Sequence, residues 1–163
     1  MDRETYGDNY QNHLLEQYKL YVEMADRISA RRVQINSFYI SLLSGLIAII
    51  SVLGSKDLFS YFKQTKLQYF TLFLVGLLGI TLCWVWQSNI RSYKQLNSVK
   101  FKVICEMEKY MPFSVYEREW DVLKKNKEYK AYIEQSIVEK YIPFILAAPY
   151  LILLIYSLIV FWR

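Results

Sequence analysis

The stretch VQINSFYISLLSGLIAIISVLGS, residues 33–55, decides the fold, because it contains no Asp, Glu, Lys or Arg. About 20 helical residues are enough to cross the roughly 30 Å hydrocarbon layer of a bilayer. Two further stretches, 67–90 and 141–162, are also free of these four residue types and also long enough. The sequence therefore predicts an integral membrane protein with three transmembrane α-helices.

The composition agrees with such a segregated chain. Of the 163 residues, 54% are hydrophobic and 21% are charged, so the apolar residues must be concentrated in a few segments. The first 30 residues are polar and lack a basic region leading into a short apolar core, which excludes a secretory signal peptide. The formal net charge of +5 is dispersed among carboxylates and flanks the spans, so we interpret it as a topology signal and expect no nucleic-acid partner.

Basic residues near the span ends indicate the orientation. Loops on the cytoplasmic side of a membrane carry an excess of Lys and Arg. Basic residues cluster before the first span and after the second, at Lys19, Arg27, Arg31, Arg32, Arg91, Lys94, Lys100 and Lys102. The loop between these spans holds Lys56, Lys63 and Lys66 against Asp57. The prediction is a cytoplasmic N-terminus, a cytoplasmic segment 91–140 and a C-terminus outside.

The first two spans are expected to be the membrane halves of longer helices. Leu14, Tyr18, Tyr21, Ala25 and Ile28 recur at steps of four and three, which is typical of a packed helix face. Neither Gly nor Pro interrupts residues 11–44, and no Pro occurs between residues 68 and 111. We predict one all-α domain over residues 1–163, with a helix at 11–53, a helix at 67–111, cytoplasmic helices within 114–140 and a third span at 141–162.

Three local signals concern the later helices. Pro112 is expected to end the second helix, and Ser114 with Glu117 has the spacing of a capping box that begins the next one. Pro143 lies in the first turn of the third span, where a missing amide donor costs little. Pro149 lies deeper and is expected to kink that helix.

The polar half of the second helix has two apolar flanks. Leu96, Val99 and Val103 form one flank, whereas the other holds Ile90, Tyr93, Asn97, Phe101 and Ile104. Two flanks imply two packing partners, either in the same chain or in a neighbouring subunit.

A stripe of small polar residues follows the first span. Ser37, Ser41, Ser44, Ala48 and Ser51 fall within about 40° either side of one line along the helix. Towards the N-terminus the same line passes near Gln34, Ala30, Asp26 and Glu23. One interpretation is close helix packing, which small residues permit and serine hydroxyls strengthen. The other is that several copies turn this side towards a shared, water-accessible axis.

A second small-residue stripe, Gly76, Gly79 and Cys83, lies in the second span. We interpret it as a helix-packing surface. Trp84 and Trp86 border it, and we expect both to anchor the helix at the membrane surface.

The sequence holds little that indicates enzyme chemistry. His13, the single histidine, stands among polar residues, and Cys83 and Cys105 have no metal-ligand spacing, so we predict reduced thiols. No phosphate-binding glycine loop or nucleophile elbow is present. Apart from Cys83 and a few tyrosines, the spans carry no ionisable group, which argues against an ion-coupled transporter. We expect no enzyme, no cofactor and no metal.

Several phrases, YKQLNSVKFKVI at 93–104 above all, resemble the RipA family of small octameric bacterial membrane proteins. They are YKLYVEMADRISARR at 18–32 running into Asn36-Ser37-Phe38, and IRSYKQLNSVKFKVICEME at 90–108. Met111-Pro112-Phe113 with Tyr116 and Glu119-Trp120 follows, and then Val138-Glu139 ahead of Ile142-Pro143-Phe144. The likeness covers residues 14–144, and YKQLNSVKFKVI at 93–104 is its most specific part.

The resemblance implies a homo-octamer around a central axis, with a cytoplasmic helical collar, in the bacterial inner membrane. Relatives include an envelope protein needed for intracellular growth and an accessory pore of RNA-targeting CRISPR systems that depolarises infected cells. That pore has been linked to a nuclease-like helical fold whose signature is Arg followed a few residues later by His. No Arg stands at that spacing before His13, so no nuclease role is carried over.

The ring and the serine stripe together lead to one functional hypothesis and two rivals. The hypothesis is an oligomeric membrane pore in anti-phage defence or stress response, with Ser37, Ser41, Ser44 and Ser51 lining the axis and Glu23, Asp26 and Arg27 at the cytoplasmic mouth. The first rival is a non-conducting oligomeric scaffold for envelope maintenance or regulation. The second is a receiver for a signalling nucleotide bound by cytoplasmic Lys and Arg. Besides the bilayer and its own copies, a defence-system protein or an envelope enzyme is an expected partner.

Overall fold

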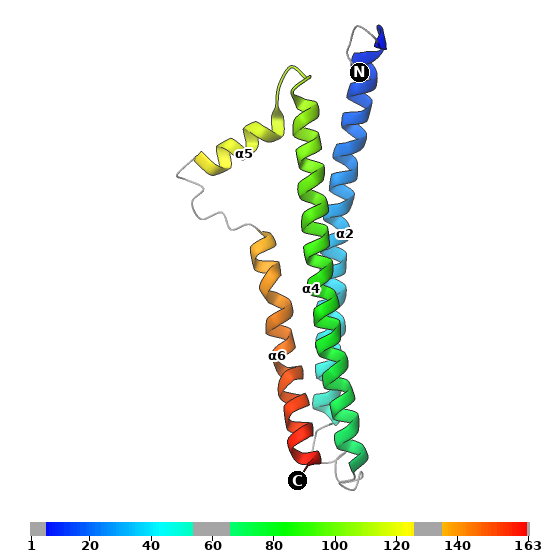
Figure 1. Ribbon diagram of the computed structural model, residues 1–163, viewed down its shortest axis with the longest axis vertical. Helices are drawn as coiled ribbons and strands as arrows, with labels where there is room; N and C mark the ends of the chain where they lie inside the picture. Colours follow the sequence, from blue (N-terminus) through cyan, green and yellow to red (C-terminus); the bar gives the residue numbers. More distant parts are fainter. Residues whose placement is uncertain (1–5, 54–65, 126–134, 163) are drawn as a thin grey trace. The chain divides into compact units, whose positions relative to one another are not determined.

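A computed structural model of the chain describes residues 6–53, 66–125 and 135–162. Within these ranges four α-helices follow one another: α2 at Tyr10–Leu53, α4 at Lys66–Glu108, α5 at Val115–Lys125 and α6 at Gln135–Phe161 (Figure 1). Three of them, α2, α4 and α6, are long and apolar enough to cross a membrane. The predicted all-α fold with three candidate spans is therefore confirmed.

The helix boundaries follow the sequence signals closely, with two differences. Helix α4 ends at Glu108 rather than at residue 111, because the amides of Tyr110 and Met111 bond to carbonyls three residues back in a tight turn before Pro112. Helix α6 begins at Gln135, six residues before the predicted span, and it continues through Pro143 and Pro149. The predicted cytoplasmic helices within 114–140 appear as α5 and the first turns of α6, whereas residues 126–134 lie outside the described ranges.

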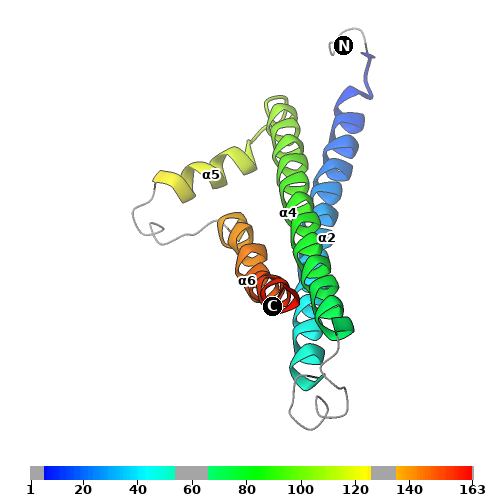
Figure 2. The same ribbon diagram turned by 60° about the horizontal axis from the view of Figure 1, so that its bottom comes forward.

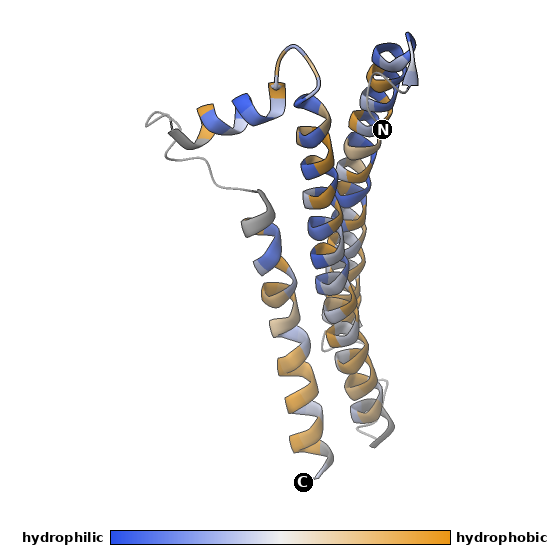
Figure 3. Cartoon of the chain, turned by 45° about the horizontal axis from the view of Figure 1, so that its top comes forward, coloured by the Kyte–Doolittle hydropathy of each residue, from blue (hydrophilic) through white to orange (hydrophobic). Residues whose placement is uncertain are grey.

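Contacts within the chain group it into two units. The apolar unit contains residues 33–91 and 135–163, and Figure 3 shows that its helices are mostly hydrophobic, with a hydrophilic turn near the start of α6. The charged unit contains residues 1–32 and 92–134, where hydrophilic and hydrophobic residues alternate along the helices. Helices α2 and α4 contribute to both units. The predicted single domain over residues 1–163 stays a prediction.

In the apolar unit, Tyr150 on α6 contacts both α2 and α4. Its ring is fully buried, and its hydroxyl donates a hydrogen bond to the carbonyl of Leu43 on α2 at 2.6 Å. A Cβ added to Gly79 on α4 would lie only 2.1 Å from the Tyr150 ring. Gly79 is therefore a position where only glycine lets the aromatic ring approach the helix backbone.

A buried polar contact joins α2 and α4 in the same unit. The Trp86 indole donates a hydrogen bond to the Asn36 side-chain oxygen at 2.8 Å, and Trp86 stacks on Tyr39 with ring centroids 5.6 Å apart. The Asn89 amide also donates to the Tyr39 hydroxyl at 3.3 Å. These contacts pair residues in the thirties of α2 with residues in the eighties of α4. Figure 2 shows that the two helices run in opposite directions.

These contacts confirm one prediction for the second span and correct another. Gly76 and Gly79 contact α6, and Cys83 belongs to the buried core, so the small stripe is a packing surface as expected. Trp84 is 76% exposed, as a membrane-surface anchor should be, but Trp86 is fully buried. The expectation that Trp86 anchors the surface was wrong, because its indole N–H satisfies the buried Asn36 amide instead.

Candidate functional site

The serine stripe of α2 is exposed along its whole length in the described chain. Leu43 on the same helix is fully buried against the core of the apolar unit, whereas Ser37, Ser41, Ser44, Ala48 and Ser51 are all exposed. The helices of this unit therefore pack against another side of α2. Packing within one chain does not explain the stripe, which leaves a neighbouring subunit, water or lipid as its environment.

The exposed stripe continues into the charged unit. Gln34, Ala30, Asp26 and Glu23 are exposed as well, so one small and polar side follows α2 through most of its length. Ser51 donates its hydroxyl to the carbonyl of Ile47 at 2.8 Å, which satisfies this group within the helix. A serine bonded in this way adds little cost in an apolar environment and still offers its lone pairs to water.

The three predicted mouth residues do not have the same surroundings. Arg27 and Glu23 form an ion pair with a distance of 2.6 Å between the guanidinium and the carboxylate, and both side chains are largely exposed. Asp26 instead lies near α5. Burial raises the pKa of Tyr116 on this helix most, and the negative charge of Asp26 raises it further. Exposed pairs of this kind contribute little to stability, about 0.3–0.5 kcal/mol, so their charges remain available to an ion or a partner.

No local sequence pattern singles out the residue that organises the charged unit, Glu108. One of its carboxylate oxygens accepts hydrogen bonds from the Tyr18 hydroxyl at 3.0 Å and from the amides of Val115 and Tyr116, both at 3.1 Å. The side chain is only 1% exposed. Glu108 therefore ties α2, α4 and the N-terminus of α5 together, and a carboxylate at a helix N-terminus is favoured by the exposed amides there.

The helix start predicted at Ser114 is correct, although its main cap is another residue. The Ser114 carbonyl accepts the first helical bond, from the amide of Arg118. The amides of Val115 and Tyr116, the first two residues of the helix, donate to Glu108, which stands seven residues before Val115. A capping box links residues three apart, so no local pattern points to a cap supplied by the preceding helix.

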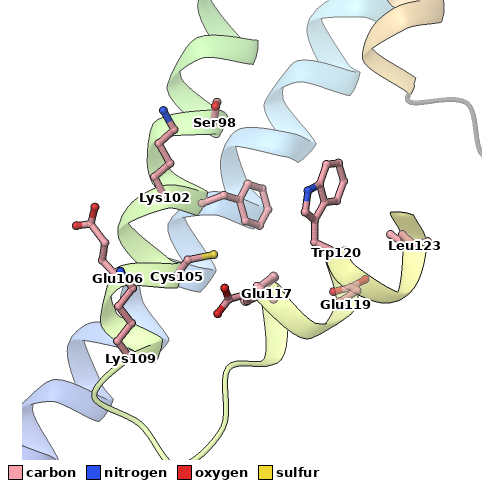
Figure 4. Close-up of a pocket in the computed structure, with 11 residues that line it drawn as sticks. Ser98, Lys102, Cys105, Glu106, Lys109, Glu117, Glu119, Trp120 and Leu123 are labelled. Carbon is pink, nitrogen blue, oxygen red and sulfur yellow. The ribbon is translucent and has the colours of Figure 1, made fainter. Parts of the chain in front are cut away.

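A cleft of about 800 Å³ separates α4 from α5 in the charged unit. Figure 4 shows Cys105 on α4 pointing towards α5, and Trp120 on α5 pointing into the space between the helices. The Phe101 ring meets Tyr116 edge to face, with centroids 5.4 Å apart. Lys102 and Lys109 line the rim together with Glu117 and Glu119, so the cleft has no concentration of positive charge suited to a phosphate group.

In the described part of the chain, no group of three or more His, Cys, Asp or Glu residues is placed so that it could hold a metal ion. His13 is exposed, and its ring nitrogen Nδ1 forms a 2.7 Å hydrogen bond with the Tyr6 hydroxyl. Cys83 and Cys105 are free thiols, as predicted. In the charged unit, burial and nearby carboxylates raise the pKa of Cys105, which makes this thiol a poor nucleophile.

Three long apolar helices, with the packing of α6 on α2 and α4, define the class of this protein: a multi-pass α-helical membrane protein. Residues 15–159 match the model of the octameric membrane protein family (8xMP). The chain belongs to this family, whose name implies an assembly of eight copies. No curated protein and no solved structure matches the chain.

Proposed function

We propose that eight copies of this chain form a membrane pore in which α2 lines the central axis. The observation that carries the proposal is the exposure of Ser37, Ser41, Ser44 and Ser51 on one side of a helix that crosses the apolar unit. Membership of an octameric family supplies the neighbours that a ring requires. A ring of identical subunits must turn one face of each subunit towards its centre.

The physical argument concerns where a polar side can be placed in a bilayer. Hydroxyl groups facing lipid lose their hydrogen bonds to water, whereas hydroxyls facing a water-filled axis keep them. The remaining surface of the apolar unit is suited to lipid, with exposed residues such as Phe38, Ile49, Leu77 and Ile152. Serines at the axis and aliphatic side chains at the periphery satisfy both environments.

The proposed path is polar but uncharged inside the bilayer. Residues 33–55, 67–90 and 141–162 contain no Asp, Glu, Lys or Arg, so nothing in them selects strongly for one sign of charge. Selectivity would then arise at the proposed mouth, where Glu23, Asp26 and Arg27 stand. We propose a passive pore without enzyme activity or cofactor.

The resemblance to RipA proteins and to the accessory CRISPR pore supports a setting for this activity. In this proposal the protein resides in a bacterial inner membrane, has a cytoplasmic N-terminus, and depolarises the membrane during anti-phage defence or stress. The helices of the charged unit would then meet a defence-system protein or another cytoplasmic signal.

The test is ion flux from liposomes that contain the purified full-length protein. We expect flux from the wild type and a loss of at least tenfold from Ser41→Leu, because eight leucines would make the axis apolar. Thr81→Leu is the matched control, since Thr81 is an exposed hydroxyl residue of α4 outside the stripe. Vesicles that stay tight at high protein loading would refute the pore and favour the scaffold.

A further inference from the structure

The charged unit has an apolar groove between α2 and α4. A hollow of about 680 Å³ is lined by Leu14, Leu20 and Tyr21 from α2 and by Val103 and Met107 from α4. Exposed apolar residues extend it by helical turns: Met24 follows Leu20 on α2, while Val99 and Leu96 precede Val103 on α4. We call these residues the α2/α4 groove.

The groove includes the flank of Leu96, Val99 and Val103 that the sequence of α4 predicted. The other predicted flank is covered within the chain, where Ile104 is fully buried. The flank in the groove is open, with Val99 56% and Leu96 47% exposed, and Leu20 on α2 is 55% exposed. Because both helices are otherwise rich in charge here, a contiguous apolar strip of this kind indicates an interaction surface.

Helix α5 and the groove lie on different sides of α4. Phe101 and Cys105 line the cleft towards α5, whereas Val103 lines the groove. Residues two apart on a helix point about 200° apart, so Phe101 and Val103 point in nearly opposite directions. The chain's own α5 therefore leaves the groove uncovered.

The α5 helix has an exposed surface that suits this groove. Val115 and Val122 share one face at a spacing of seven residues, and they are 51% and 40% exposed. The groove offers apolar contacts along its length, with Arg31 two turns beyond Met24 and with Glu106 and Lys109 at the other end. The exposed valines of α5 thus match the exposed apolar strip of the groove.

Symmetry selects the arrangement of the copies. A groove that packed against the same groove of a second copy would make a two-fold contact, which closes at two copies. A ring of eight needs two different surfaces on each copy, so that the contact can repeat from one subunit to the next. The groove and the outer face of α5 are two such surfaces on one unit.

We propose that the α2/α4 groove of each subunit receives α5 of the adjacent subunit. The contact forms a ring of interlocked helices in the charged unit and gives α5 its role in assembly. This inference deepens the proposed octamer and rests on the assembly of eight copies, but it does not depend on conduction.

The experiment is disulfide cross-linking of the full-length protein in liposomes, with Cys83→Ala and Cys105→Ala as background. Val99→Cys combined with Val122→Cys is expected to give a ladder that extends beyond dimers to eight subunits. Ser98→Cys with Val122→Cys is the matched control and should give no ladder, since Ser98 lines the cleft towards the chain's own α5. Dimers from Val99→Cys alone would show a groove-to-groove contact and overturn the proposal.

A second measurement does not depend on cross-linking. Val99→Asp should abolish the octamer in native mass measurements, whereas Ser98→Asp should retain it, with helix content checked by circular dichroism. An octamer that persists in Val99→Asp, or an intact octamer without a ladder, would refute the contact. Flux from the same vesicles separates the two proposals. A full ladder without flux refutes the pore and leaves the contact standing. Flux without a ladder refutes the contact and leaves the pore standing.

Discussion

The two units hold the same pair of helices, α2 and α4, by different means. In the apolar unit the fixing contacts are a buried hydrogen bond between Trp86 and Asn36 and the insertion of Tyr150 against Gly79. In the charged unit they are the burial of Ile104 and the carboxylate of Glu108. In the apolar unit, where the surroundings are apolar, a buried hydrogen bond and close packing against a glycine fix the register of the two helices. In the charged unit, where water competes for hydrogen bonds, burial of an apolar side chain and capping of a helix fix it.

The largest expected effect tests the close approach in the apolar unit. Gly79→Ala should destabilise the protein by about 3 kcal/mol, because the new methyl group overlaps the Tyr150 ring and α6 must shift. Thermal unfolding in detergent measures the change. Gly45→Ala is the control, since a Cβ at Gly45 meets nothing within 4 Å, and its melting temperature should equal or exceed that of the wild type. Equal effects from both variants would contradict the described packing.

The next effect tests the buried hydrogen bond. Trp86→Phe should cost about 2 kcal/mol, because the Asn36 side chain, only 9% exposed, loses its donor. Combining Trp86→Phe with Asn36→Leu removes both polar partners and should cost less than the sum of the two single changes. Additive losses in this double-mutant cycle would mean that the bond does not join the helices.

The smallest effect tests the charged unit. Glu108→Ala should cost about 1 kcal/mol, the usual value of a lost helix cap, and should speed hydrogen exchange at the amides of Val115 and Tyr116. Glu106→Ala is the matched control, because Glu106 is exposed two residues earlier on α4. If exchange at α5 is the same in both variants, Glu108 does not hold the helix.

The sequence predicted the helices well and their partners poorly. Charge-free length identified the three spans, and Pro112 with Ser114 located the break before α5, because these signals are local. The role of Glu108 could not be predicted, since its partners stand 90 and seven residues away. Trp86 was placed at the surface because tryptophan usually lies there, and only the position of Asn36 on a different helix explains its burial.

By itself, the sequence determined that this chain has three segments long and apolar enough to cross a membrane, that its first two helices are long, and that α2 has a small polar side. Hydropathy and helical periodicity carry these properties within single segments. The tertiary structure decided which sides are used: it buried Leu43 and Ile104, left the serines and the α2/α4 groove open, and fixed α5 through Glu108. Which side of a helix meets a partner depends on residues far away in the chain, so it is settled only when the helices pack.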